Sequence, residues 1–155
     1  MKIHIIGGGG SGKSTFARKL AKEHNFPLLE LDNIFWDNSV KGYDKKRAKE
    51  ERLKLLSDFM QNESYIIEGV YYSWLDNSFE TADKIYILDV NIHIRNYRIL
   101  KRLALRKLGI LQGKNDTLKS IINLIKWNFE HLRDDMPKIM DLANKYPNKV
   151  EVIKP

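Results

Sequence analysis

The hydrophobic residues follow two different spacings along the chain, and these spacings predict its elements. Short apolar runs predict buried strands over residues 2–6, 26–31, 65–69, 84–90 and 149–153. Apolar residues at intervals of three and four predict helices over residues 14–24, 45–61, 93–108 and 117–133. Strands that alternate with helices are typical of an α/β protein with a parallel sheet.

Three further segments complete this outline. The stretch Val70–Trp74 predicts the opening of another helix after the third strand. Pro137 predicts a kink or a new helical start, with Asp134 or Asp135 as the cap and a last helix to about Lys145. Asp89, at the end of the fourth strand, is a candidate cap or a supporting acid, and we assign it no catalysis.

The first predicted strand runs into a glycine-rich segment that fits the pattern G-x-x-x-x-G-K-[ST], the phosphate-binding P-loop. The segment reads Gly7-Gly8-Gly9-Gly10-Ser11-Gly12-Lys13-Ser14, followed by Thr15. Glycines let the backbone curl around phosphates, so that its N–H groups and the helix start face the anion. A flexible glycine linker is the alternative, but it does not explain a lysine and a hydroxyl at a helix start directly after an apolar strand.

The residue types of this segment predict ATP and Mg²⁺ as its ligands. We expect Lys13 to reach the β- and γ-phosphates and Ser14 Oγ to bind Mg²⁺. We expect Thr15 to hydrogen-bond the α-phosphate.

Acidic residues close the second and third predicted strands, where ligands bind in open parallel sheets. Asp32 is expected to meet the substrate or a water-bridged Mg²⁺, or else to cap a short helical turn. Glu68 is expected to organise Mg²⁺ or its water, or to act as a base towards an acceptor hydroxyl. A buried or capping glutamate is the structural alternative for Glu68.

Aromatic residues follow the same two strand ends. Phe35 and Trp36 are expected either to wall a substrate pocket or simply to pack, and the sequence does not separate these alternatives. Gly69 lets the backbone turn beside a ligand, and Tyr71 or Tyr72 is expected to face the acceptor.

The fourth predicted helix carries a regular row of arginines at spacings of three, four and four: Arg95, Arg98, Arg102 and Arg106. At about 100° per residue these side chains share one face of the helix. They form either its solvated side or the wall of an anion cleft, and a P-loop in the same chain favours the cleft, with Arg98 and Arg102 at its centre.

Two mobile segments are expected around the cleft. Residues 33–62 would form a substrate arm, and residues 107–118, which contain two glycines, would form a lid that excludes water during phosphoryl transfer. A plain helix–helix connection is the alternative for the lid. Arg133 lies near the predicted break at Pro137 and is expected to enter the cleft with the lid.

Composition narrows the class of protein. A chain of 155 residues predicts one domain, 1–155, with a sizeable core. No apolar run approaches the roughly 20 residues that span a bilayer, so we expect no membrane partner. The chain starts as strand and loop, so we expect no signal peptide. It has no cysteine, which excludes disulfides and thiolate metal sites and agrees with a cytoplasmic location.

The quoted motifs resemble those of the P-loop nucleoside and nucleotide kinases, in the adenylate and shikimate kinase branch. Within this branch, the closer resemblance is to the DNA topology modulation (FlaR-like) group. It rests on these segments in order: GGGGSGKST, LDNIFW, YIIEGVY, ADKIYILDV with RNYRILKR, and IKWNFE.

The resemblance implies a three-layer P-loop NTPase fold of class α/β. Its five-stranded parallel sheet would have the order 2-3-1-4-5, flanked by helices, with a lid and with Arg98 and Arg102 clamping phosphate. Two features depart from the family: Glu68 stands where aspartate is common, and no helix follows the last strand, where relatives build the adenine pocket.

Two functions remain in view. The first is an ATP-dependent kinase that transfers the γ-phosphate, with Mg²⁺, to a nucleotide or another small-molecule acceptor. The second is an ATP-binding, nucleic-acid-associated regulator, which the resemblance and the net charge of +7 suggest. The chain lacks a nucleic-acid-binding signature and its most regular basic row is expected inside the cleft, so the kinase is favoured.

Overall fold

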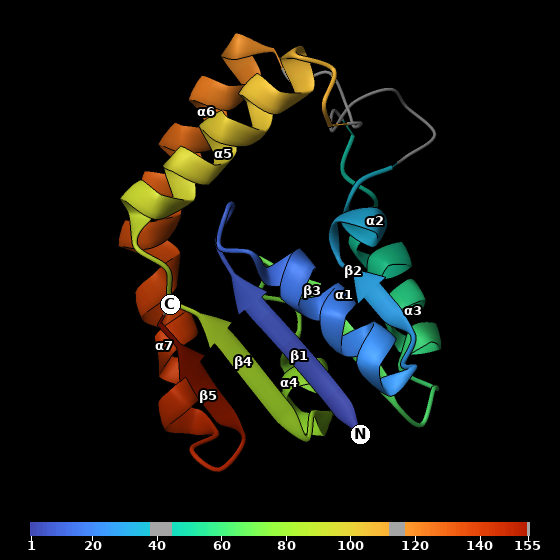
Figure 1. Ribbon diagram of the computed structural model, residues 1–155. Coiled ribbons are helices and arrows are strands. Elements are labelled where there is room, and N and C mark those ends of the chain that lie inside the picture. Colours follow the sequence, from blue (N-terminus) through green and yellow to red (C-terminus); the bar gives the residue numbers. More distant parts are fainter. Residues whose placement is uncertain (38–44, 112–116, 155) are drawn as a thin grey trace.

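The computed structural model describes residues 1–37, 45–111 and 117–154, and its centre is a parallel sheet (Figure 1). Every adjacent pair of strands is parallel, and the order is β2-β3-β1-β4-β5. The strands are β1 (Lys2–Gly7), β2 (Leu28–Glu30), β3 (Tyr65–Gly69), β4 (Lys84–Leu88) and β5 (Val150–Ile153). The predicted sheet and its order are therefore confirmed.

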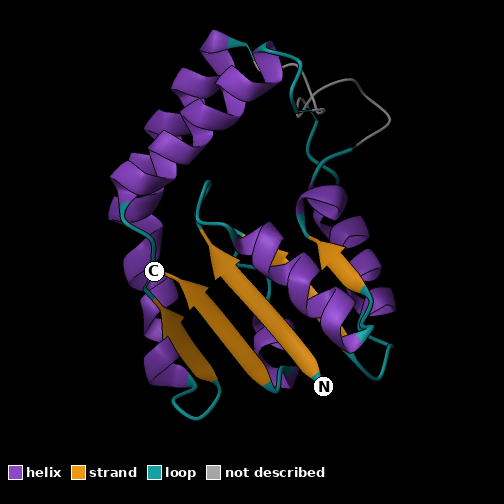
Figure 2. Ribbon diagram, in the orientation of Figure 1, coloured by secondary structure: helices purple, strands orange, loops and turns teal. Residues whose placement is uncertain are grey.

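Helices cover both faces of the sheet (Figure 2). On one face, α1 (Lys13–His24) packs Ala17 against Ile3 and Ile5 of β1. On the other face, Ile6 packs with residues of three helices: α3 (Lys49–Phe59), α4 (Asp76–Thr81) and α7 (Met136–Lys145). The period of two along β1 thus sends alternate side chains into two separate cores.

Two helices form a hairpin that extends beyond the carboxyl ends of the strands (Figure 1). They are α5 (Ile92–Lys107) and α6 (Leu118–Glu130), and they share a third core of Ile99, Leu103 and Ile121. Asn91 caps α5 by accepting a hydrogen bond from the His93 N–H at 2.9 Å. Asp89 therefore does not cap this helix, and it lies 3.8 Å from Lys154 Nζ instead.

The helix predicted to open at Val70 is absent from the structure, because the next helix, α4, begins only at Asp76. Two neighbouring tyrosines of the intervening segment each donate a hydrogen bond to a distant aspartate. The Tyr71 hydroxyl donates to Asp32 Oδ1 at 2.8 Å, and the Tyr72 hydroxyl donates to Asp135 Oδ1 at 3.1 Å. These tertiary contacts, together with the low helix propensity of aromatic residues, explain the wrong prediction.

Pro137 marks a new helical start, as predicted, because α7 begins at Met136 and ends at Lys145. The π-helix η1 (His131–Asp135) lies between α6 and α7. Pro137 stands in the first turn of α7, where a missing N–H costs no hydrogen bond, and neither Asp134 nor Asp135 caps the helix with its side chain. The short helix α2 (Asp32–Phe35) follows β2. None of the helices in the described residues is long and apolar enough to cross a membrane.

The imidazole of His4 is a titratable group buried on the face of the sheet that α4 covers. It is 1% exposed, packs against Phe79 and lies 2.9 Å from Ser78 Oγ. Burial lowers the pKa of His4 from 6.5 to about 3. Because this pKa lies below the value in the unfolded chain, the unfolded state binds the extra proton as the pH falls.

We predict that the free energy of unfolding falls as the pH drops from 7 to 5, and that His4→Gln reduces this fall by about 2 kcal/mol. Chemical denaturation at both pH values measures the difference. His24→Gln, at an exposed position, is the matched control and should leave the fall unchanged. An equal pH dependence in wild type and His4→Gln would contradict the prediction.

Candidate functional site

The glycine loop between β1 and α1 has the geometry of an anion cradle. Gly10 and Gly12 take φ angles of 77° and 95°, which side chains with a Cβ rarely adopt. Helix α1 begins at Lys13 with Gly12 as its cap residue and no side-chain cap. The first N–H groups of an α-helix have no intrahelical partner, and among the described residues no side-chain cap satisfies those of α1. They are available to an anion.

The loop forms one wall of a cavity of about 530 Å³. Gly10, Gly12, Lys13, Ser14 and Thr15 line it from the loop and the start of α1. This volume falls within the range of about 300–1,000 Å³ found for small-molecule sites.

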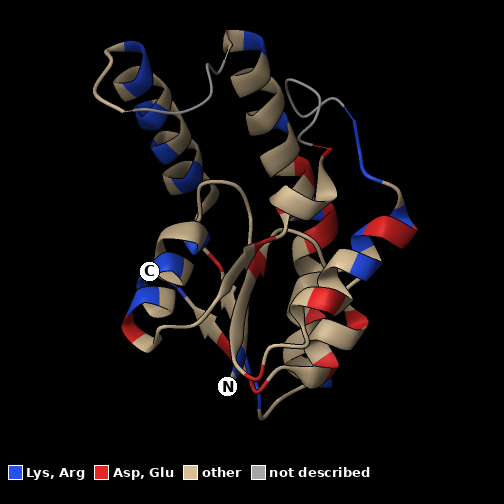
Figure 3. Cartoon of the chain, turned by 90° about the vertical axis from the view of Figure 1, so that its right-hand side faces the viewer, with Lys and Arg blue, Asp and Glu red and all other residues tan. Residues whose placement is uncertain are grey.

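The opposite wall of the cavity comes from α5. Arg98, Arg102 and Arg106 line it, with Ile99 and Leu111. Arg98 also donates to the Ser11 carbonyl at 3.0 Å, which ties the two walls together. Figure 3 shows the basic residues recurring along this arm of the hairpin, and α5 carries no acid to neutralise them. The structure thus brings three arginines of the predicted row to the glycine loop.

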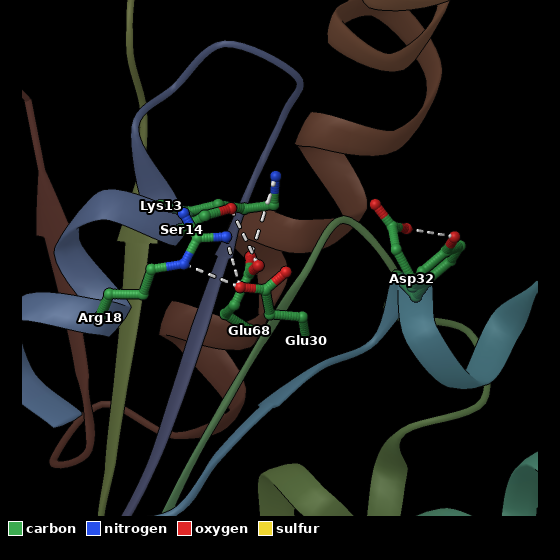
Figure 4. Close-up of polar contacts among 7 residues, drawn as sticks. Lys13, Ser14, Arg18, Glu30, Asp32 and Glu68 are labelled. Atoms are coloured by element: carbon green, nitrogen blue, oxygen red, sulfur yellow. Dashed lines mark hydrogen bonds and ion pairs between the residues drawn. The ribbon is translucent and has the colours of Figure 1, made fainter. Parts of the chain in front are cut away.

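Glu68 lies at the base of the loop, at the end of β3 (Figure 4). It is 4% exposed, accepts a hydrogen bond from Ser14 Oγ at 2.9 Å and lies 3.9 Å from Lys13 Nζ. Burial raises the pKa of Glu68, although the Lys13 ammonium and the Ser14 hydroxyl act in the opposite direction. The predicted acid and the two predicted phosphate and metal ligands therefore meet in one place.

A second ion pair, which the sequence did not single out, lies beside this group (Figure 4). Arg18 Nη2 contacts Glu30 Oε1 at 2.6 Å, and Arg18 also lines the cavity. Glu30 is the register partner of Glu68 on the neighbouring strand. The spacing Ser14–Arg18 was the available signal, because residues four apart share one face of a helix.

Asp32 and the aromatic residues lie further along the edge of the sheet. Figure 4 shows Asp32 apart from the cluster around Glu68. Its carboxylate accepts the Tyr71 hydroxyl rather than capping α2. Phe35 stacks on Tyr71 with ring centroids 4.3 Å apart and meets Trp36 edge-on at 5.0 Å. Gly69 contributes close packing here, because a Cβ at that position would lie 2.7 Å from Leu31.

The predicted entry of Arg133 into the cleft with the lid stays a prediction, and in this structure Arg133 makes a different contact. Arg133 stands in η1, is largely exposed and pairs with its neighbour Asp134 at 2.7 Å. It is not among the residues that line the cavity. Part of the predicted lid and arm lies outside the described residues, at 112–116 and 38–44, so these two segments stay predictions.

A family model described as an AAA domain matches residues 3–116, which include the glycine loop and the arginine row. The chain belongs to this family. The family consists of P-loop proteins, and the position of the loop between β1 and α1 agrees with that membership.

Among curated proteins, the chain is 36% identical over 101 residues to a Bacillus subtilis (strain 168) protein called "Uncharacterized protein YqaC". The match covers 64% of this chain and 55% of the relative, so the chain spans about half the length of that protein.

Two solved structures share the fold. One is a shikimate kinase from Bacteroides thetaiotaomicron, with a TM-score of 0.57 and 21% identity over 88% of this chain and 80% of that one. The other is a sugar kinase from Janibacter sp. HTCC2649, with a TM-score of 0.55 and 17% identity over 99% of this chain and 84% of that one. At these identities the likeness concerns the fold alone.

We predict that Glu68→Gln makes the protein more stable at pH 7. Because the pKa of Glu68 is raised on folding, its ionised form weakens the folded state above the unfolded pKa, and this cost is absent from the amide. Urea denaturation should show a gain at pH 7 that shrinks towards pH 4. Glu63→Gln, at an exposed position, is the control and should show no gain. A variant less stable than wild type at pH 7 would mean that the contact with Lys13 outweighs the cost of burial.

Proposed function

We propose that the protein is a kinase that transfers the γ-phosphate of ATP to a small-molecule acceptor, possessing either a hydroxyl or a phosphate group. One observation carries this proposal: a single cavity is lined on one side by the glycine loop with Lys13, and on the other by three arginines. A site that only binds nucleotide needs the first wall. Transfer also needs cations around the phosphoryl group that moves, and the second wall supplies them.

The two walls divide the charge of a bound triphosphate. The unsatisfied N–H groups at the start of α1 and the Lys13 ammonium face the loop side. The guanidinium groups of Arg98 and Arg102 face the same space from α5. Arginine suits this position because its planar fork stays charged and can bind two phosphate oxygens at once.

The donor set also fits a magnesium ion that is held chiefly by phosphate and water. The described residues contain no group of three or more His, Asp or Glu side chains that would hold a metal by themselves. Ser14 Oγ and the Glu68 carboxylate are adjacent oxygens beside the loop, and Mg²⁺ commonly uses one or two such ligands. When bound there, Mg²⁺ would neutralise charge on the phosphates.

Glu68 is the residue best placed to orient the acceptor. Its Oε2 atom is buried and has no hydrogen-bond partner in the described part of the chain. The raised pKa of this carboxylate suits a group that takes a proton from an acceptor hydroxyl. Asp32 and Tyr71 would form the outer part of the acceptor site, with Phe35 as a flat apolar surface. A lid over residues 107–118 would exclude water.

The alternative function is an ATP-binding regulator that associates with nucleic acid, such as DNA. The net charge of +7 is compatible with it. The location of Arg98, Arg102 and Arg106 favours the kinase, because side chains that line a cavity are not presented to a duplex.

A paired assay separates the two functions. Transfer of labelled γ-phosphate from ATP is measured against a panel of nucleotides, sugars and hydroxy acids, beside DNA binding at two salt concentrations. We predict ATP turnover that rises with one acceptor class and a labelled product. No labelled product from any acceptor, together with tight DNA binding that weakens steeply with salt, would reject the kinase.

Single substitutions test the two walls. We predict that Lys13→Ala and Arg102→Ala each lower kcat by roughly 100-fold or more, because both charges act on the transferring phosphate. The KM for ATP should change less than kcat for Arg102→Ala. Lys101→Gln, an exposed neighbour on α5 outside the cavity, is the control. Wild-type kcat in Lys13→Ala would refute the P-loop assignment. Wild-type kcat in Arg102→Ala would mean that Arg102 belongs to the solvated side of the helix and does not act on phosphate.

A further inference from the structure

The first arginine of the row differs from the other three, because Arg95 is buried behind the glycine loop. It is 2% exposed and does not line the cavity. Its Nε donates to the Gly9 carbonyl at 3.0 Å, and its Nη2 donates to Asn128 Oδ1. Arg95 therefore contacts the loop without lining the cavity in which a phosphate would lie.

The loop has the glycines that this contact requires. A Cβ on Gly8 would lie 1.9 Å from the Arg95 guanidinium, and a Cβ on Gly10 would lie 2.5 Å from the Arg95 backbone oxygen. Neither distance is sterically possible. Two glycines of the run thus make room for Arg95 as well as for a ligand.

Asn128 completes the contact from the second arm of the hairpin. It is 0% exposed, and its Nδ2 donates to the Gly9 carbonyl at 3.2 Å and to Asn96 Oδ1 at 3.1 Å. The Gly9 carbonyl thus accepts hydrogen bonds from both α5 and α6. Gly9, unlike Gly10 and Gly12, is not a cavity-lining residue, so its carbonyl is held away from the space where anionic phosphates would bind.

The charge of Arg95 has no direct counterion. Its hydrogen-bond acceptors are neutral, and no carboxylate of the described residues forms an ion pair with it. Asp89 attracts it only at longer range and is itself 3.8 Å from Lys154 Nζ. Burial lowers the pKa of the guanidinium but leaves it charged at neutral pH. An uncompensated buried charge is costly, which calls for a functional reason.

The positive charge of Arg95 also affects the pKa of His131. Burial, followed by the charges of Arg95 and Lys13, lowers the pKa of His131 to about 4. Arg95 and Lys13 thus both contribute positive potential at His131.

We propose that Arg95 and Asn128 are positioning residues of the phosphate site. Asn128 and Arg95 hold the Gly9 carbonyl away from the cavity. The Arg95 charge adds to the attraction between the loop and a bound polyphosphate. This inference rests on the proposed function only in requiring that the loop binds a polyphosphate. It adds that the affinity depends on a charge that never touches the ligand.

Four variants separate charge from packing, and each is tested for binding of MgATP and of inorganic triphosphate by calorimetry. Arg95→Gln keeps polar atoms but removes the charge, so we expect about tenfold weaker binding of both probes. Arg95→Lys keeps the charge and should recover part of that loss. Asn128→Asp keeps the shape of the side chain and the acceptor for Arg95, but it adds a negative charge and loses both hydrogen bonds that Nδ2 donates. Asn128→Ala removes the hydrogen bonds without adding charge.

The order of the two Arg95 variants is the decisive readout. If charge matters, Arg95→Lys binds triphosphate more tightly than Arg95→Gln, and Asn128→Asp binds it more weakly than Asn128→Ala. If the network only supports the fold, Arg95→Lys binds triphosphate no more tightly than Arg95→Gln. Thermal unfolding establishes that each variant is folded, and Lys101→Gln is the control for removing one cation from α5.

The outcomes distinguish this inference from the proposed function. Wild-type protein that binds neither probe contradicts both. Wild-type protein that binds both probes, with a folded Arg95→Gln variant that binds them equally well, contradicts the inference alone, and so does a folded Arg95→Lys variant that binds triphosphate no more tightly than Arg95→Gln.

Discussion

Backbone N–H groups without partners, at the start of α1, are the constraint around which the site is organised. The helix begins directly after a buried strand and a glycine loop, and no side chain caps it. Such a helix start is stable when an anion or water satisfies its donors. The loop must also keep its carbonyls out of the way, and Arg95 and Asn128 hold the carbonyl of Gly9 from behind. The same hairpin then presents Arg98, Arg102 and Arg106 to the cavity.

The site accumulates buried charge that the fold alone does not need. Glu68 is buried with a raised pKa, and Arg95 is buried without an ion-pair partner among the described residues. Each arrangement costs stability, since burial disfavours the charged form of a side chain. Both residues contact the same segment, Arg95 at Gly9 of the loop and Glu68 at Ser14 directly after it. Buried charges that cluster in this way are typical of functional sites. Such sites often lower the stability of the fold because their charged groups are arranged in advance for a ligand.

Local patterns in the sequence were enough for the sheet and for the loop, because a strand, a glycine motif and a helix start are all short-range features. The arginine row was also visible from its spacing, but not the separation of Arg95 from the rest. That separation depends on Asn128, which lies 33 positions away and meets Arg95 only through the packing of α5 on α6. The wrong prediction of a helix at Val70 has the same origin, because Tyr71 and Tyr72 are held by distant acids.

The crystal structure of the protein with Mg²⁺ and a non-hydrolysable ATP analogue tests the central claim most directly. Our account predicts the β- and γ-phosphates within the loop at Gly10–Ser14, with Arg98 and Arg102 turned towards the γ-phosphate and Arg95 still bonded to the Gly9 carbonyl. An analogue bound elsewhere on the molecule, or one bound in the loop with both cavity arginines turned to solvent, would contradict it.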